Sequence, residues 1–594
     1  MTRRPLRPLA RILPARARGE NLDAIEAENL RLRREAARDR ARQRAESRLI
    51  VLALMFFVAF TVIGARMGLL AASRPVEVQA AAPADDAISG FRADITDRAG
   101  RLLATNVATN ALYAQPPLMV DPVRAAAGLA AIFPDEDAET LLRRFSEPGR
   151  RFIWLRRQLS PEQVQAVHDI GEPGLLFGPR EMRLYPNGTL AAHVLGGARF
   201  GREGVRAAEV IGTAGIERAL DDALRAEGAG PLRLSLDLSV QAATEEVLAT
   251  GMTLLNARGA TAVVMDIHSG EIVALASLPT FDPNDRPAPP VSGDPADSPL
   301  FNRAVQGLYE LGSTFKVFAV AQALELGLVT PATMIDTTSP MTWGRFRISD
   351  FHNLGPQLSV TDVIVESSNV GTARIAAEIG AARQRDFLGR LGLLAPTALE
   401  LVEAPGAKPL LPANWSEIST MTIAYGHGLS TSPLHLAAAY ASVLNGGTLV
   451  RPTLVAGAGN PAPGPRVVSE ATSATLRGML RQVVTRGTAS FAEVPGSAVG
   501  GKTGTADKAR PTGGYYDDRV IATFAGIFPS DAPRYVVVVT LDEPVETSGS
   551  VPRRTAGWTA VPVAAEVIGR IGPLLGVRPQ IATAPHSAIT RVSN

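Results

Sequence analysis

The hydrophobic pattern sets off one long apolar segment near the start of the chain. Leu49–Ala65 runs for 17 residues without a charge, a length at the lower limit for a helix that crosses a membrane. The apolar stretch reaches residue 72 if the side chain of Arg66 extends back to the membrane surface. A cleaved signal peptide would have a shorter apolar core and a shorter basic front, although an A-x-A-like stretch occurs at Ala71–Ser73. The pattern predicts a single transmembrane helix over residues 49–72.

Further along the chain, apolar runs alternate with turns in a way that predicts paired strands. Thr261–Ser277 holds two apolar runs about a turn at His268–Gly270, which indicates a hairpin. Residues 519–530 and 534–544 form a second pair of apolar runs near the C-terminal end. Long apolar helices are predicted between the two strand pairs and after the second one. Strands at both ends of a region with helices between them predict an α+β fold, with an antiparallel sheet faced by helices.

The remaining segments carry weaker patterns. Residues 73–90 are rich in Ala and Pro and predict a linker. Residues 91–232 combine short strands with charged helices and hold no pairing of a nucleophile with a base, so we expect a non-catalytic spacer or docking domain. Residues 233–575 form the larger, strand-and-helix domain, and residues 576–594 are expected to be a disordered tail.

The charge distribution gives the expected orientation. Residues 1–48 carry 14 Arg against 7 Asp and Glu, and basic flanks stay on the cytoplasmic side of a membrane. This segment is predicted to be a charged cytoplasmic helix, either solvated or bound to a partner helix or acidic lipid. Everything after the apolar segment is then expected outside the cytoplasm.

Composition excludes several classes of function. The chain has no cysteine, so disulfides, thiolate metal sites and a cysteine nucleophile are excluded. Its seven histidines show no H-E-x-x-H or similar spacing, so no metal site is expected. The net charge of +2 leaves no basic footprint for nucleic acid.

The segment Gly496–Lys508 fits two incompatible motifs. Read from Gly496 it satisfies the phosphate-binding pattern G-x-x-x-x-G-K-[ST], and read from Lys502 it is K-T-G-T. A phosphate-binding loop needs a buried strand before it and a helix that begins at the lysine. Here Gly504, Pro511 and two further glycines follow the lysine, so no helix can begin there. The K-T-G-T interpretation is therefore preferred.

Lysine is rare in this chain, and that rarity is informative. Of 60 basic residues only four are lysines, at positions 316, 408, 502 and 508. A lysine can lose its proton and act as a base, whereas an arginine effectively cannot. Lys316 follows Ser313 by three residues in an almost wholly apolar helical stretch, so its amine can reach the serine hydroxyl. Burial, a helix N-terminus and a second nearby cation would all favour a neutral amine.

Two further short motifs complete the candidate site. Ser367-Ser368-Asn369 contains an S-x-N triplet, which on its own is more often a polar turn or helix cap. Lys502-Thr503-Gly504-Thr505 on its own could be an ordinary loop. In this order within one domain, S-x-x-K, S-x-N and K-T-G form the signature of penicillin-binding proteins and serine β-lactamases.

With these motifs the chain resembles a class B penicillin-binding protein over residues 91–572. The segments 93–106, 183–197 and 212–224 are similar to the family's non-catalytic, dimerisation-like pedestal domain, and "NRAVQGLYELGSTFK" and "TIAYGHGLSTSPLHLAAAYASVLNGG" to its transpeptidase domain. The resemblance implies a five-stranded antiparallel sheet faced by helices. Within the family the chain is most similar to the septal D,D-transpeptidases, with the elongation-specific members as the nearest alternative. Leu311 and Ala214 depart from the family pattern, and we expect only local changes in packing there.

The resemblance also implies a role for each site residue. Ser313 would attack the penultimate D-Ala carbonyl of a stem peptide and Lys316 would take its proton. Ser367 would relay a proton to the leaving amine, and Asn369 would hold the substrate amide and the lysine. Lys502 would supply positive potential beside Gly504, and the hydroxyls of Thr503 and Thr505 would bind the substrate carboxylate. The backbone N–H groups of Ser313 and Thr505 would form the oxyanion hole, and no cofactor or metal is implied.

The resemblance further implies partners and a location, and it leaves alternatives open. The expected ligands are peptidoglycan stem peptides and β-lactams. The expected partners are a glycosyltransferase of the shape, elongation, division and sporulation (SEDS) type and membrane proteins of the divisome. The expected location is the inner membrane, single-pass and type II, with a periplasmic catalytic domain. The region holds no E-x-x-x-N pattern, which argues against a class A β-lactamase, whereas a D,D-carboxypeptidase of the same fold shares the donor chemistry. A penicillin-sensing receptor would need more membrane helices, and an inactive scaffold would have lost motif residues.

Overall fold

The computed structural model describes residues 48–67 and 91–579, except 205–207, 460–463 and 511–512, together with isolated positions before residue 48. Most of the predicted cytoplasmic segment, the predicted linker at 73–90 and residues 580–594 of the predicted tail lie outside the described residues. Within them, Arg48–Met67 is the one helix long and apolar enough to cross a membrane, and none of it is buried. It corresponds to the predicted transmembrane helix up to residue 67.

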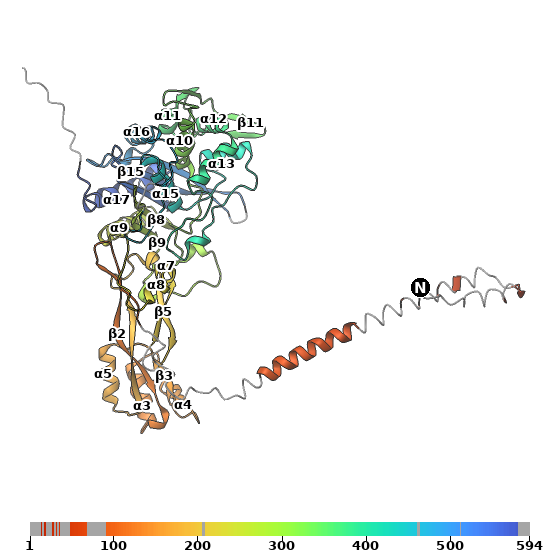
Figure 1. The fold of residues 1–594 in the computed structure, drawn as a ribbon, viewed down its shortest axis with the longest axis vertical. Helices are drawn as coiled ribbons and strands as arrows, with labels where there is room; N and C mark the ends of the chain where they lie inside the picture. The colour runs from red at the N-terminus through yellow and green to blue at the C-terminus, as the bar shows by residue number, and fades with distance from the viewer. Residues whose placement is uncertain are drawn as a thin grey trace, which may run out of the picture.

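The pedestal domain is built around one long strand (Figure 1). Strand β2 (Leu102–Ala114) pairs antiparallel with β4 (Leu175–Leu184) along ten positions and with β3 (Ile153–Arg156) near its end. At its start β2 pairs with β1 (Ile95–Thr96), which runs parallel to β7 (Leu232–Arg233).

Three helices close the far end of the pedestal around a small apolar core. They are α3 (Pro122–Ile132), α4 (Ala138–Phe145) and α5 (Pro161–Ile170). Each begins with an Asp or Ser whose side chain accepts a hydrogen bond from a backbone N–H group in the first turn, as expected for helix N-caps. Their core includes Leu129, Leu141 and Val167 and is separate from the main core of the molecule.

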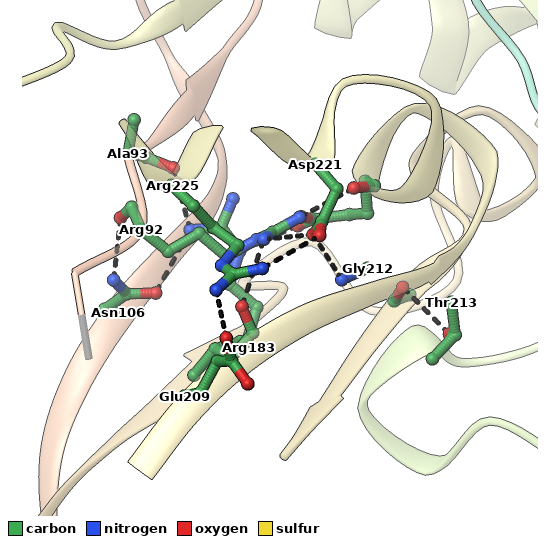
Figure 2. A network of polar contacts seen from close by, with 12 residues as sticks. Arg92, Ala93, Asn106, Arg183, Glu209, Gly212, Thr213, Asp221 and Arg225 are labelled. Carbon is green, nitrogen blue, oxygen red and sulfur yellow. Dashed lines mark hydrogen bonds and ion pairs between the residues drawn. The ribbon is translucent and has the colours of Figure 1, made fainter. Parts of the chain in front are cut away.

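A buried charged network holds the other end of the pedestal together (Figure 2). Arg92 donates to Glu217 at 2.6 Å and to Asp221 at 2.7 Å, and Arg183 donates to the other oxygen of Glu217 at 2.7 Å. The side chains of Arg92 and Glu217 are completely buried. These residues come from the start, the middle and the end of the domain, namely from the segment before β1, from β4 and from helices α7 (Gly215–Ala219) and α8 (Asp221–Arg225). The network therefore joins segments that are distant in sequence.

The catalytic domain contains the five-stranded antiparallel sheet that the sequence analysis expected. Its order is β14–β15–β16–β8–β9, with β8 (Gly259–Asp266) and β9 (Ile272–Leu278) forming the predicted hairpin. Strands β15 (Tyr515–Phe528) and β16 (Tyr535–Asp542) form the predicted second pair. Strand β14 (Gly500–Ala509), which carries the K-T-G-T motif, is an edge strand.

Helices cover the sheet on both sides, so its central strand is buried throughout. All eight residues of β16 are buried. Helix α9 (Leu238–Leu254) and helix α17 (Ala560–Leu574) pack on each other and on the sheet, and α15 (Pro433–Leu444) packs on its central strands as well. A further group of helices stands beyond the β14 edge, including α10 (Lys316–Glu325), α12 (Asn369–Ile379) and α16 (Glu470–Arg486). The functional motifs lie where this group meets β14.

The pedestal and the catalytic domain share one apolar core and several polar contacts. Buried Ile95 and Leu103 of the pedestal belong to the same cluster as the sheet residues of the catalytic domain. Arg98 donates to Glu271 at 2.7 Å, and the amide of Asn284 exchanges two hydrogen bonds with the backbone of Tyr185, both 2.9 Å long. The two parts are therefore packed against each other rather than joined by a tether alone.

Candidate active site

The predicted nucleophile lies on a tight turn pressed against strand β14. Ser313 is the second residue of a short 3-10 helix, Gly312–Phe315, and α10 begins at Lys316. The sequence analysis expected Ser313 and Lys316 in one helical stretch, whereas the structure divides it into these two parts. A Cβ at Gly504 would overlap the carbonyl oxygen of Leu311, so only glycine allows β14 to approach the turn this closely.

Lys316 reaches from the first turn of α10 toward the S-x-N motif. Its Nζ donates to the carbonyl oxygen of Ser367 and, at 3.1 Å, to the Ser367 hydroxyl. Ser313 lies three residues earlier and is partly exposed. No described residue forms a hydrogen bond with the Ser313 hydroxyl, so this oxygen stays open to a ligand.

Ser367 connects the two predicted lysines. Its hydroxyl accepts from Lys502 Nζ at 2.9 Å as well as from Lys316. The Ser367 backbone has φ of 64°, the left-handed region that L-residues other than Asn and Gly seldom adopt. This conformation places one hydroxyl between two amines that come from distant parts of the chain.

The two lysines have lowered pKa values because they are buried. Both side chains are completely buried. Burial lowers the pKa of Lys316 well below its usual value, and the charge of Lys502 lowers it further, while Asp350 opposes the shift. Burial lowers the pKa of Lys502 to about 7. A neutral amine can accept a proton, and the lowered pKa of Lys316 favours that neutral form.

Asp350 organises the N-terminus of α12, a role that the sequence analysis did not predict. Its carboxylate accepts from the Ser368 hydroxyl at 2.9 Å and from the backbone N–H groups of Asn369 at 2.5 Å and Val370 at 3.1 Å. The Asn369 amide donates to the Ser349 carbonyl at 3.0 Å. In this structure Asn369 therefore lies beside the loop before the motif, and no hydrogen bond joins it to Lys316.

The K-T-G-T motif lies on strand β14, so no helix begins at Lys502. This agrees with the rejection of the phosphate-binding interpretation. Lys502 Nζ also donates to the Thr503 carbonyl at 3.1 Å, and the Thr503 hydroxyl lies 2.8 Å from that of Thr488. The Thr505 hydroxyl accepts from the backbone N–H of Ala556 at 2.9 Å, which leaves its own hydrogen free to donate. Ser367 and β14 thus lie on two sides of one site, and the turn that carries Ser313 packs against β14.

A second group of residues that the sequence analysis missed lies beside the nucleophile turn. Glu310 accepts from the Tyr515 hydroxyl at 2.9 and 3.1 Å and from the Gly428 N–H at 2.8 Å. The carbonyl of Gly426 accepts from the Gly312 N–H at 3.3 Å, so His427 lies between two contacts to the nucleophile turn. No local pattern indicates these pairings, because each joins segments more than 100 residues apart.

The two departures from the family pattern lie in tightly packed backbone. Leu311 is 1% exposed, and its carbonyl accepts from the Thr314 hydroxyl at 2.9 Å. Ala214 is extended, and its backbone leaves no room for a Cβ at Gly196. Neither residue forms a hydrogen bond with Lys316 or Lys502. Among the described residues no cluster of His, Asp and Glu could hold a metal ion.

Comparison with known proteins identifies the family of both domains. Residues 260–567 match the penicillin binding protein transpeptidase domain, and residues 87–230 match the penicillin-binding protein dimerisation domain. The chain belongs to the class B penicillin-binding proteins. It carries the family's catalytic domain on a pedestal of the family's dimerisation type, and its fold is the mixed α+β architecture expected from the sequence.

Individual relatives support this assignment. The penicillin-binding protein is 36% identical to the probable peptidoglycan D,D-transpeptidase FtsI of Caulobacter vibrioides, over 93% of this chain and 94% of the relative. It is 30% identical to the peptidoglycan D,D-transpeptidase FtsI of Escherichia coli, over 84% and 86%. Among solved structures, penicillin binding protein 3 from Mycobacterium tuberculosis complexed with ampicillin matches with a TM-score of 0.62 and 27% identity, over 83% of this chain and 97% of that one.

Proposed function

We propose that this penicillin-binding protein is a peptidoglycan D,D-transpeptidase of the septal type, which crosslinks stem peptides through an acyl-enzyme on Ser313. The observation that carries the proposal is the Ser367 hydroxyl, which is held between two completely buried lysines. One of them, Lys316, lies one helical turn after the open Ser313. Relatives named as FtsI match almost the whole chain, which supports the septal assignment.

In the first half-reaction Ser313 attacks the carbonyl of the penultimate D-Ala. Neutral Lys316 takes the serine proton, and the Ser367 hydroxyl passes a proton to the departing D-Ala amine. The bond from serine Oγ to the carbonyl carbon forms as the peptide bond breaks. In the proposed mechanism the backbone N–H groups of Ser313 and Thr505 stabilise the oxyanion. The close packing of the nucleophile turn on β14 supports this role.

Strand β14 is proposed to hold the donor peptide. Its free edge offers backbone groups, and the Thr505 hydroxyl retains a hydrogen for the terminal carboxylate. Lys502, with a pKa of about 7, is partly charged in the empty site. A bound carboxylate favours its charged form. In the proposed mechanism Thr503 assists Lys502, and Asn369 turns from Ser349 toward the substrate amide.

The proposed location follows from the anchor and its flanks. The helix at 48–67 is proposed to hold the protein in the inner membrane in a type II orientation, with residues beyond it in the periplasm. Neither matched domain is a glycan polymerase. We therefore propose that a SEDS-type glycosyltransferase and divisome membrane proteins act with this chain. Copurification of membrane complexes with and without residues 1–72 tests that part of the proposal.

The decisive experiment for the reaction is labelling with a fluorescent penicillin, followed by gel and intact-mass analysis. The wild type is expected to keep a stable adduct, and Ser313→Ala is expected to form none. An adduct that is rapidly released would instead indicate a hydrolase. Complete absence of an adduct would contradict the catalytic assignment. Release of free D-Ala without crosslinked product, when stem peptides are supplied, would indicate a carboxypeptidase.

A further inference from the structure

In the second half-reaction the acceptor ammonium group loses two protons, and the residues discussed so far account for one of them. The inference that follows rests on the proposed function. A primary amine on a neighbouring stem is an ammonium near pH 7, because its usual pKa is about 10. It loses one proton before its nitrogen can attack the Ser313 ester. It loses a second as the C–N bond forms and the C–Oγ bond breaks, and that proton returns to Ser313 through Lys316. The first proton needs another base.

His427 lies next to residues that contact the nucleophile turn, and it is the candidate for that base. The residues on either side of it hold the nucleophile turn, since Gly426 accepts from the Gly312 N–H and Gly428 donates to Glu310. Its side chain is partly exposed. Nδ1 is enclosed and has no hydrogen-bond partner among the described residues. This leaves Nε2 as the ring nitrogen available to a ligand.

His427 is also neutral near pH 7. Burial lowers the pKa of His427 and the charge of Lys316 lowers it further, whereas the carboxylates of Glu310 and Asp507 oppose the shift. The Tyr425 ring lies 5.4 Å from the imidazole. Burial and the nearby Glu310 raise the pKa of Tyr425 to about 12, so this neighbour carries no charge near neutrality.

Two carboxylates on the same side of the site would attract a cation. Glu310 is held by the hydroxyl of Tyr515 and the N–H of Gly428. Burial raises the pKa of Tyr515 and Glu310 raises it further, so Tyr515 stays uncharged. Asp507 is exposed on β14, two residues beyond Thr505. Opposite charge favours the ammonium form of an arriving amine, which increases its local concentration but also makes a base necessary.

We propose that His427, Glu310 and Asp507 form the acceptor site, in which the carboxylates bind the ammonium group of a neighbouring stem and the imidazole takes its first proton. The ammonium N–H bond breaks as a proton passes to the imidazole. The neutral amine then attacks the ester carbonyl, the amide forms and Ser313 regains its hydrogen. The imidazolium releases its proton to solvent, so the enzyme returns to its starting state.

The test compares transfer to an amine with transfer to water from the same acyl-enzyme. A thioester analogue of the donor stem acylates the full chain, and the ratio of aminolysis to hydrolysis is measured near pH 7 with D-alanine as the acceptor. In His427→Gln this ratio is expected to fall at least tenfold. Penicillin acylation uses no acceptor and reports whether the variant is folded. His268→Gln changes an exposed histidine in the β8–β9 turn and is the matched control, with an unchanged ratio.

A second acceptor separates proton removal from a general loss of structure. Hydroxylamine is largely uncharged near pH 7, so it needs no prior deprotonation. Its transfer rate in His427→Gln is expected to stay within about twofold of wild type. Asp507→Asn is expected to raise the KM for the D-alanine acceptor several-fold. An unchanged ratio in His427→Gln, or an equal loss with both acceptors, would overturn the inference. A wild type that labels with penicillin but never transfers to any amine would contradict the proposed transpeptidase itself.

Discussion

At the scale of single residues, the site depends on lysine where the rest of the chain uses arginine. Four lysines stand among 60 basic residues, and two of them donate to one hydroxyl, that of Ser367. A guanidinium keeps its proton at every accessible pH. The chemistry of the site therefore depends on amines whose protonation the fold can change.

Lys316→Arg tests this dependence directly. The variant keeps a cation but loses the base, so the rate of penicillin acylation is expected to fall by a factor of about 10²–10⁴. Stopped-flow measurement of acylation with a fluorescent penicillin gives the rate. Lys408→Arg, at an exposed lysine, is the matched control and should react like wild type. Acylation by Lys316→Arg at more than a tenth of the wild-type rate would show that another group takes the serine proton.

The pH dependence of acylation should report the protonation of Lys316. Only the neutral amine accepts a proton, so the rate is expected to rise with pH through the lowered pKa of Lys316 and to level off above it. The charge of Lys502 contributes to that lowering. In Lys502→Met the Lys316 pKa rises, and the midpoint of the remaining activity moves to higher pH. Rate profiles for both proteins between about pH 5 and pH 10 test this; a midpoint that stays fixed or moves down would contradict it.

The sequence identified the chemical groups of the site but not all of their neighbours. Ser313, Lys316, Ser367 and Lys502 could be predicted because short spacings and rare lysines distinguish them. Asp350, Glu310 and His427 have no such local signal, since their importance comes from contacts that form only when distant segments fold together. Asn369 shows the same limit, because its present partner is a backbone carbonyl in a loop.

At the scale of secondary structure, the decisive contact is between the nucleophile turn and strand β14. Gly504→Ala places a methyl group against the Leu311 carbonyl and Thr314. The turn must then move away from the strand. We expect a loss of stability of about 2 kcal/mol or more and a fall in acylation rate of at least tenfold.

Gly478→Ala provides the matched control for that substitution. Gly478 lies in helix α16, where an added Cβ meets nothing within 4 Å. The variant should gain about 0.5–1 kcal/mol because alanine favours a helix over glycine. Denaturant unfolding and penicillin labelling measure both variants. Normal acylation by Gly504→Ala would show that the turn does not need its close approach to β14.

The elements themselves followed closely from the hydrophobic pattern. The hairpin at 261–277, the strand pair at 519–544 and the long apolar helices are where the pattern places them. The break between Gly312–Phe315 and α10 was not predicted, because no proline or glycine after Gly312 marks it in the sequence up to Glu325. The backbone changes there to fit the strand beside it, which is a tertiary effect.

At the scale of the whole molecule, the pedestal and the catalytic domain are expected to unfold together, because one core cluster spans both. Glu217→Ala leaves Arg92 and Arg183 buried without their shared carboxylate. Removing one partner of a buried ion pair costs about 3–5 kcal/mol, so calorimetry of residues 91–579 should show a single transition at a lower temperature.

The control for this substitution is an exposed ion pair. Glu566 pairs with Arg570 on the surface of α17, and Glu566→Gln should leave the unfolding midpoint unchanged. At temperatures below the transition, Glu217→Ala should still bind penicillin at Ser313. Two separate transitions in the wild type would show that the pedestal folds independently.

The packing of the two domains against each other was the feature that could be predicted least well from the sequence. We propose that the two domains divide near residue 232. Strand β7 at Leu232–Arg233 pairs with the pedestal, whereas the next helix packs on the catalytic sheet. The Arg92–Glu217 pair spans 125 residues. No periodicity indicates such a pairing, because each residue is a single charge in an otherwise ordinary segment.

The backbone of Ser367 has a consequence for how such a sequence changes over generations. A residue at φ of 64° costs the fold free energy that glycine would recover, and only the use of the hydroxyl opposes that change. Selection for catalysis therefore keeps serine at this position, although a change to glycine would stabilise the fold. In a descendant released from its reaction, glycine at this position should be among the first substitutions to become fixed, before the neighbouring motifs decay.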